Sequence, residues 1–242
     1  MWIQAIQKIQ VIQKSCPLNL LNPLNPLNLF NIPTQASSRY SPRMPLIVLE
    51  GPDGAGTTKH SKLLADRLTK EGHKVVLTAE PTDGPIGSFI RSILKSPSGD
   101  VEALRAMPLP SPGALKLLFC ADRADHVARV IAPALAAGKT VISDRYSLST
   151  IVYGAAQGLD RDWLQSINNA FPKPDVIFLL LPPYEVCAER VGRRATKDQF
   201  EVDAFQRKVY AEYEKARSPE MIVIDTSGLA EEVAGTIEAF VK

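Results

Sequence analysis

Residues Leu46-Ile-Val-Leu-Glu-Gly51-Pro-Asp-Gly-Ala-Gly56-Thr-Thr58 lead directly into the amphipathic segment Ser61-Lys-Leu-Leu-Ala-Asp-Arg-Leu68. The apolar run predicts a strand, the glycines at 51, 54 and 56 a turn, and the following segment a helix. Because glycine carries no side chain, the N–H groups of such a turn can converge on one point, where the helix N-terminus adds partial positive charge. The segment therefore predicts a phosphate site; the alternative is a plain glycine-rich turn between a strand and a helix.

This junction departs from the phosphate-binding (P-loop) pattern GxxxxGK[ST] at one position. Gly51, Gly56 and Thr58 fit the pattern, but Thr57 stands where lysine is expected. Lys59 does not replace it, because two residues along a helix rotate a side chain by roughly 200°. We expect the missing cation to come from elsewhere, or the activity to be reduced. Thr58 keeps the hydroxyl that would hold Mg²⁺, and the predicted ATP-phosphate contacts are Gly51, Pro52, Asp53, Gly54, Ala55, Gly56, Thr57 and Thr58.

Downstream, short apolar runs alternate with longer amphipathic segments. Strands are predicted at 46–49, 74–77, 140–143, 175–181 and 221–224, and helices at about 58–71, 84–96, 112–136, 161–171, 184–194, 202–217 and 229–241. The strands are apolar throughout, which is typical of a sheet that is covered on both faces. Strand followed by helix, repeated, predicts an α/β fold with a parallel sheet and right-handed crossovers, whose ligands bind at the carboxyl ends of the strands.

Composition narrows the class of protein. The 242 residues are 45% hydrophobic and 22% charged, with 28 basic and 26 acidic residues, which is typical of one globular domain. This balance gives no reason to expect nucleic-acid or membrane-surface binding. The sequence also contains no run of 18 apolar residues, the length that would predict a membrane span. Cys16, Cys120 and Cys187 form no CxxC pair, so we expect reduced thiols in a cytoplasmic protein.

The first 43 residues differ from the rest of the chain. They contain no acidic residue and include Pro17-Leu-Asn-Leu-Leu-Asn-Pro-Leu-Asn-Pro-Leu-Asn-Leu29, in which repeated proline prevents a helix or a central strand. We expect a disordered or mis-started extension at 1–43 and a domain at 44–242 that begins with Met44. An organelle transit peptide is the alternative, because the opening residues have helical apolar spacing and no acids.

Further motifs make the prediction more specific. They are Glu80-Pro81, the segment Leu117-Leu-Phe-Cys-Ala-Asp-Arg-Ala-Asp-His126, Asp144-Arg145-Tyr146 with Ser149 and Tyr153, Pro172-Lys-Pro-Asp175, and the arginine-bearing segment 190–201. In this order and spacing the chain from Pro45 onward resembles the thymidylate kinases. The resemblance implies a three-layer P-loop NTPase fold, with a five-stranded parallel sheet flanked by helices and a small lid at about 190–201. It also implies a homodimer that transfers the γ-phosphoryl group of ATP to dTMP with Mg²⁺.

The resemblance also assigns roles to residues. It implies that Asp53 holds the 3′-hydroxyl of the acceptor, that Phe119 stacks on thymine and Arg123 bonds its carbonyl, and that Tyr153 favours deoxy sugars. It further implies acceptor binding by Glu80, Arg91, Arg145 and Ser149, metal binding by Thr58 and Asp144, and catalytic roles for Asp53, Arg145, Arg193 and Arg194. Independently, residues 119 and 123 share one helix face. The alternatives are a core Phe beside a surface Arg, an exposed helix Arg at 91, and a solvated basic helix end at the lid.

Several positions depart from the family pattern. Ala79 replaces the usual arginine before Glu-Pro, Tyr153-Gly-Ala-Ala replaces a Tyr-Gln-Gly run, and the lid reads Asp198-Gln-Phe-Glu201. We expect lid arginines, among them Arg190, to supply the charge that Thr57 lacks. Other functions remain open: a related nucleoside monophosphate or deoxynucleoside kinase with a different acceptor, a catalytically weak nucleotide-binding paralogue, or a P-loop regulatory or partition protein.

Overall fold

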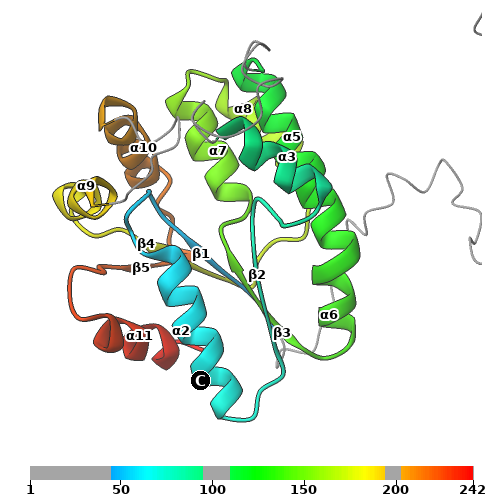
Figure 1. The fold of residues 1–242 in the computed structure, drawn as a ribbon, viewed down its shortest axis with the longest axis vertical. Helices are drawn as coiled ribbons and strands as arrows, with labels where there is room; N and C mark the ends of the chain where they lie inside the picture. Colours follow the sequence, from blue (N-terminus) through cyan, green and yellow to red (C-terminus); the bar gives the residue numbers. More distant parts are fainter. Residues whose placement is uncertain (1–44, 95–109, 194–202, 242) are drawn as a thin grey trace, which may run out of the picture. The chain divides into compact units, whose positions relative to one another are not determined.

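A computed structural model describes residues 45–94, 110–193 and 203–241, all of which belong to one compact unit, Pro33–Lys242. Five strands form a parallel sheet in the order β2-β3-β1-β4-β5 (Figure 1). They are β1 (Leu46–Glu50), β2 (Val75–Ala79), β3 (Thr140–Asp144), β4 (Val176–Leu180) and β5 (Met221–Ile224). The predicted α/β class and the five predicted strands are confirmed.

The helices pack on both faces of the sheet. They are α2 (Thr57–Lys70), α3 (Pro85–Leu94), α5 (Pro112–His126), a π-helical turn η2 (Val127–Ile131), α6 (Ala132–Ala136), α7 (Ser147–Ala156), α8 (Arg161–Asn168), α9 (Tyr184–Gly192), α10 (Asp203–Lys215) and α11 (Ala230–Ala239). None of these described helices has the length and hydropathy that a membrane span requires.

Alternate residues of β1 supply two separate cores, as the pleat of a strand requires. Ile47 and Leu49 belong to the cluster that α2 and α11 complete, whereas Leu46 and Val48 belong to the cluster formed with η2 and α6. All five residues of β1 are buried. In Figure 1, α2 and α11 accordingly lie on one face of the sheet and the α5–α6 run on the other, giving three layers.

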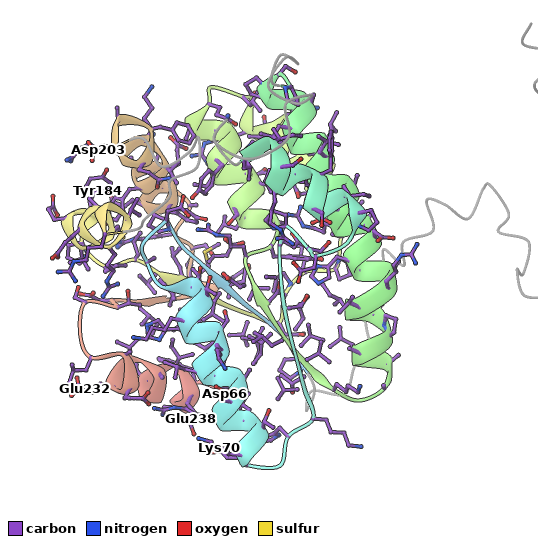
Figure 2. All side chains as sticks on the ribbon, viewed as in Figure 1. Asp66, Lys70, Tyr184, Asp203, Glu232 and Glu238 are labelled. Atoms are coloured by element: carbon purple, nitrogen blue, oxygen red, sulfur yellow. The ribbon has the colours of Figure 1, made fainter. Side chains whose placement is uncertain are left out.

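Helices α2 and α11 are also joined at their surface. Arg67 of α2 donates to the Glu238 carboxylate at 2.9 Å and to the Glu231 carboxylate at 2.7 Å. Figure 2 shows Glu238 on α11 beside Asp66 and Lys70 of α2. These bonds hold the helix that follows the glycine-rich turn against the last helix of the chain.

The long predicted helix at 112–136 contains an irregularity that the sequence analysis did not anticipate. Residues Val127–Ile131 are π-helical, and Pro133 follows two residues later. Proline lacks an N–H group, and its ring collides with the carbonyl four residues earlier in a regular helix. The wider turn just before Pro133 removes this conflict and lets the two α-helical parts continue as one run.

Helix α7 is absent from the predicted elements. Its sequence, Ser147-Leu-Ser-Thr-Ile-Val-Tyr-Gly-Ala-Ala156, combines β-branched residues with a glycine, both of which have low helix propensity. A Cβ atom on Gly154 would lie 2.5 Å from Cδ2 of Leu164 on α8, so a side chain here would force the buried Leu164 side chain to move. Close packing between two helices, which no local pattern reveals, therefore sets this part of the fold.

Candidate active site

The glycine-rich turn joins β1 to α2 and has the backbone form that the sequence predicts. Gly54 and Gly56 have φ angles of 86° and 91°, which are in the left-handed region. A Cβ atom on Gly51 would lie 2.4 Å from the Leu180 carbonyl oxygen, and one on Gly54 would lie 2.4 Å from the Cys187 carbonyl oxygen. Gly56 is the N-cap of α2, and no side chain caps this 14-residue helix. Its first N–H groups can therefore bind an anion.

Thr58 and Asp144 meet beside this turn. The Thr58 hydroxyl donates to Oδ2 of Asp144 at 2.5 Å, and Asp144 is the last residue of β3, paired with Leu49 of β1. Oδ1 of Asp144 is buried and has no hydrogen-bond partner among the described residues. The described part of the chain has no cluster of three or more His, Cys, Asp or Glu side chains for a metal. A hydroxyl with one carboxylate fits Mg²⁺, which takes most of its other oxygens from phosphates and water.

Arg145 and Asp53 form an ion pair between the glycine-rich turn and the end of β3. Nη2 of Arg145 lies 2.6 Å from Oδ1 of Asp53, while Nη1 donates to the Gly51 carbonyl at 2.8 Å. Burial alone would lower the pKa of Arg145, but the nearby Tyr153 and Asp53 outweigh it and raise this pKa, so the guanidinium stays charged. The Tyr153 hydroxyl donates to the other Asp53 oxygen, Oδ2, at 2.8 Å.

A pocket of about 140 Å³ opens next to this ion pair. Its lining combines aromatic faces with charged groups: Asp53, Glu80, Pro81, Leu94, Lys116, Phe119, Arg123, Arg145, Tyr146, Ser149, Thr150 and Tyr153. The structure thus brings together all of the predicted acceptor-binding residues except Arg91. A slot between an aromatic ring and a guanidinium can hold a planar base. Because Asp53 lines this pocket and also belongs to the glycine-rich turn, a base in the slot would lie next to that turn.

Arg123 lies in the wall of the pocket and is completely buried. Two nitrogens of its guanidinium donate to Oε2 of Glu80, Nε at 2.9 Å and Nη2 at 2.8 Å. Nη2 also donates to the Thr150 hydroxyl at 2.9 Å, and Nη1 donates to the side-chain oxygen of Asn168. Nδ1 of His126 holds the second Glu80 oxygen at 3.0 Å. The alternative of a surface arginine at this position is therefore wrong. Sequence reasoning missed His126, Thr150 and Asn168.

Lys116 is another pocket residue that the sequence analysis missed. Only 1% of it is exposed, and its ammonium lies 5.4 Å from the Phe119 ring centroid and 5.9 Å from that of Tyr153. Burial lowers the pKa of Lys116 to about 7, with an opposing effect from Cys120. Its place three residues before Phe119, on the same face of α5, is the signal that could have found it.

The predicted arginines outside the pocket lie in different environments. Arg91 of α3 bonds to the carbonyls of Pro81 and Thr82 and to the Asp83 carboxylate, so it is not a freely exposed helix residue. Its predicted acceptor contact stays a prediction. On α9, Arg190 donates to the Gly54 carbonyl at 3.2 Å and to the Thr226 carbonyl at 2.7 Å.

The remaining lid predictions are mostly outside the described residues. Arg193 follows α9, is largely exposed and bonds to Glu189 at 2.5 Å. Arg194 and positions 194–201 of the predicted lid lie outside the described residues, so their roles stay predictions. Figure 2 shows Tyr184 on α9 and Asp203 on α10, joined by a 2.7 Å bond from the Tyr184 hydroxyl to the Asp203 carboxylate.

Helix α10 contributes two side chains that the sequence analysis did not assign to the site. Nε2 of Gln206 donates to Oδ2 of Asp53 at 2.8 Å, and the Tyr213 hydroxyl lies 3.3 Å from Nη1 of Arg145. Residues 206 and 213 are two helical turns apart and therefore share a face. The seven-residue spacing is the only local signal for this pair.

Comparisons with known proteins agree with this geometry. The model of the family described as "Thymidylate kinase" matches residues 49–237. The chain is 43% identical over 199 residues to a "Probable thymidylate kinase" of Thermococcus kodakarensis, covering 81% of this chain and 96% of the relative. It is 41% identical to a protein of the same description from Pyrococcus horikoshii (81% and 95% covered) and 38% identical to a "Thymidylate kinase" of Desulfosudis oleivorans (80% and 94% covered). The chain therefore belongs to the thymidylate kinase family.

Proposed function

We propose that this chain transfers the γ-phosphoryl group of ATP to dTMP, giving ADP and dTDP. One observation supports this most directly: Asp53 belongs to the glycine-rich turn and also lines the pocket that contains Phe119 and Arg123. A base-binding slot and a phosphate-binding turn therefore share one residue. Family membership adds the identity of the acceptor, since the relatives are described as thymidylate kinases.

Phosphoryl transfer mainly requires that two phosphates are aligned and that their charge is neutralised. The amides of residues 51–58 would hold the β- and γ-phosphates of ATP, and Arg145 would neutralise the acceptor phosphate. An oxygen of the dTMP phosphate then bonds to the γ-phosphorus as its bond to the β,γ-bridging oxygen breaks. Asp53 keeps Arg145 in place through the 2.6 Å ion pair and is positioned for the sugar 3′-hydroxyl.

Thr58 and Asp144 are the residues that would hold Mg²⁺, and the partnerless Oδ1 of Asp144 is the atom that a metal or its water would satisfy. When bound, Mg²⁺ supplies positive charge between the ATP phosphates. Arg193 and Arg194 are the proposed sources of the charge that Thr57 lacks. Arg190 is less suited to this role, because both of its Nη atoms already bond to backbone carbonyls, Nη1 to that of Gly54 and Nη2 to that of Thr226.

The pocket walls support the acceptor assignment. Phe119 would stack on thymine and Arg123 would bond its carbonyl, while Glu80 fixes the guanidinium. Tyr153 is held by Asp53 at 2.8 Å and would occupy the space that a ribose 2′-hydroxyl needs. The pocket should thus prefer deoxy acceptors.

The deciding experiment is a coupled ATP turnover assay with dTMP, dUMP, CMP and UMP as parallel acceptors. We expect dTMP to have the highest kcat/KM. Faster turnover of CMP or UMP would identify a different kinase of the same superfamily, and nucleotide binding without turnover of any acceptor would identify a catalytically silent paralogue.

We also propose that the enzyme is a cytoplasmic homodimer whose catalytic domain begins at Met44. The family resemblance supports the dimer, and the extent of the match to relatives supports the boundary. Light scattering of the purified chain would test the first point. N-terminal sequencing of the natural protein would show whether residues 1–43 precede this domain in the mature chain, and a loss of activity in a chain truncated to Met44 would contradict the proposed boundary.

A further inference from the structure

Glu50, the last residue of β1, is a carboxylate that the proposed chemistry leaves without a role. It is completely buried, and it is not among the residues that line the acceptor pocket. Its Oε1 accepts from the backbone N–H groups of Tyr146 at 2.9 Å and Ser149 at 3.2 Å, and its Oε2 accepts from the Ser149 hydroxyl at 2.6 Å and the Tyr213 hydroxyl at 3.3 Å. Four donors therefore offset part of the cost of burying this carboxyl group, although burial still raises its pKa above the ordinary value.

Three of these donors, two backbone N–H groups and one hydroxyl, belong to the start of α7. Tyr146 is the N-cap of this helix, and its own side chain makes no capping bond. Glu50 supplies the cap from a strand that lies 96 residues earlier in the chain, and its negative charge is favourable at a helix N-terminus. Since the α7 sequence has low helix propensity, this long-range cap is important for where the helix begins.

Arg145 directly precedes this cap and has an unusual backbone. Its φ angle is 68°, in the left-handed region, which is unfavourable for a residue with a side chain. The conformation is held by a bond from its N–H to the Leu49 carbonyl at 2.9 Å and by the Ser143 hydroxyl, which donates to its carbonyl at 2.8 Å. The surrounding structure therefore imposes this conformation, and it directs the guanidinium back toward Gly51 and Asp53.

The two hydroxyls that bind Glu50 also bind the guanidinium of Arg145. Nη1 lies 3.1 Å from the Ser149 hydroxyl and 3.3 Å from the Tyr213 hydroxyl, and these hydroxyls are 2.9 Å apart. Each hydroxyl has one proton and two lone pairs. When a hydroxyl donates its proton to Glu50 or to the other hydroxyl, its oxygen can still accept a hydrogen bond from Arg145. A carboxylate at position 50, which can only accept, therefore orients both hydroxyls as acceptors toward the guanidinium.

We propose that Glu50 is a positioning residue for phosphoryl transfer. It sets the start of α7 and, through Ser149 and Tyr213, orients the Arg145 guanidinium that binds the acceptor phosphate. The inference depends on the proposed function, because it assigns Glu50 to the same reaction. It does not make Glu50 a catalytic residue, since Glu50 does not line the acceptor pocket and its carboxylate bonds to Tyr146, Ser149 and Tyr213.

The test compares Glu50→Gln and Tyr213→Phe with the matched control Tyr210→Phe. Tyr210 lies one turn earlier on the same helix, and its hydroxyl donates to the Pro182 carbonyl at 3.0 Å, outside the acceptor pocket. Glutamine has an NH2 group where glutamate has a second acceptor oxygen. If this group faces Ser149, it would donate to the Ser149 hydroxyl and turn the hydroxyl proton away from position 50. If it faces Tyr146, two donors would point at each other. We expect kcat with dTMP to fall about 10- to 100-fold for E50Q and about 3- to 10-fold for Y213F, since small displacements of aligned groups are costly. Y210F should change kcat less than twofold.

Two further measurements separate positioning from general destabilisation. Melting temperatures should fall to a similar extent in Y213F and Y210F, and KM for ATP should stay within about threefold of wild type. In an Arg145→Ala background, assayed with radiolabelled ATP, Y213F should cause no further loss of kcat, because its effect passes through Arg145. Equal kcat values for Y213F and Y210F, or full additivity with R145A, would overturn the proposal. A wild-type chain that does not phosphorylate dTMP would instead overturn the proposed function.

Discussion

The acceptor side of the site and the donor side differ in how the protein pairs the charged groups that each of them contains. In the acceptor pocket, Arg123 bonds to Glu80, Thr150 and Asn168, and Glu80 bonds in turn to His126. On the donor side, Oδ1 of Asp144 is buried without a hydrogen-bond partner among the described residues. The same holds for Nδ1 of His60 on α2, whose pKa burial lowers to about 4, so that this imidazole is neutral.

This difference indicates that the two sides are prepared in different ways. The Arg123–Glu80 wall of the acceptor pocket is organised before any ligand binds, because these two charges are already paired, whereas the hydroxyl of Tyr146 in the same pocket is buried without a hydrogen-bond partner among the described residues. The donor side leaves backbone amides and a carboxylate oxygen available, as expected for a place where phosphates and a metal complete the structure. Substitutions on the acceptor side should therefore affect both stability and binding, whereas those on the donor side should affect mainly the rate.

The largest expected effect tests the donor side. Changing Arg193 and Arg194 together to alanine should lower kcat by on the order of 10³-fold or more, because an arginine that stabilises the transition state of phosphoryl transfer typically raises the rate by that factor. The binding of dTMP, measured by calorimetry, should be almost unchanged, since Arg193 does not line the acceptor pocket. If turnover survives this double change, the compensation for Thr57 must come from another group.

The second prediction concerns the acceptor side. Arg123→Leu should destabilise the protein by about 3–5 kcal/mol in urea unfolding, because it leaves the buried Glu80 carboxylate without its cationic partner. It should also lower kcat/KM for dTMP by about 100-fold, equivalent to the loss of a charged hydrogen-bond donor. Arg129→Leu is the control, since the Arg129 side chain is 77% exposed and its ion-pair partner among the described residues is Asp125, one turn away. A loss of stability below 1 kcal/mol in R123L would mean that the pocket is not organised by this pair.

The third prediction restores the residue that the phosphate-binding pattern expects. Thr57→Lys should raise kcat about 10-fold, which corresponds to one charge-assisted hydrogen bond to the ATP phosphates. Thr57→Met matches the length of lysine without its charge and should give no gain. Equal rates for the two variants would show that the site already receives all the positive charge it can use.

The smallest expected effect is a pH dependence of stability that Lys116 causes. Its pKa is lowered by burial to about 7, so between pH 7 and 10 the unfolded chain binds more protons than the folded one, and stability due to this residue rises with pH. Lys116→Met should remove this rise, and the melting temperature of wild type relative to K116M should increase by a few degrees from pH 7 to pH 9. Lys62→Met, on the exposed face of α2, should leave the pH profile as it is. A constant difference between wild type and K116M across this range would contradict the prediction.

The sequence was sufficient to predict the strands because each is a short apolar run between polar residues, and buried parallel strands have this pattern. The predicted strand at 175–181 differs from the observed Val176–Leu180 by one residue at each end. Helix α7 could not be predicted in the same way. The bonds from Glu50 that begin it and the Gly154–Leu164 contact that packs it both join residues that are distant in sequence or specific to the folded chain.

The candidate site was predictable where a residue type and a short spacing carry the chemistry. The turn at 51–58 and the Phe119–Arg123 pair are of this kind, and the structure brings Asp53 of the turn and this pair to the same pocket. The buried partners of these residues were not predictable, because Asn168, His126 and Gln206 have no pattern of their own. They become visible only when α5, α8 and α10 pack together.

Asp53 has a consequence for how the two substrates influence one another. Its carboxylate is bonded at once to Arg145, to Tyr153 on α7 and to Gln206 on α10, while its backbone belongs to the phosphate-binding turn. A nucleotide that displaces or tightens any of these bonds must also shift the free energy of the turn. We therefore expect ATP and dTMP to bind with mutual dependence, and thermodynamic reciprocity requires each to change the dissociation constant of the other by the same factor.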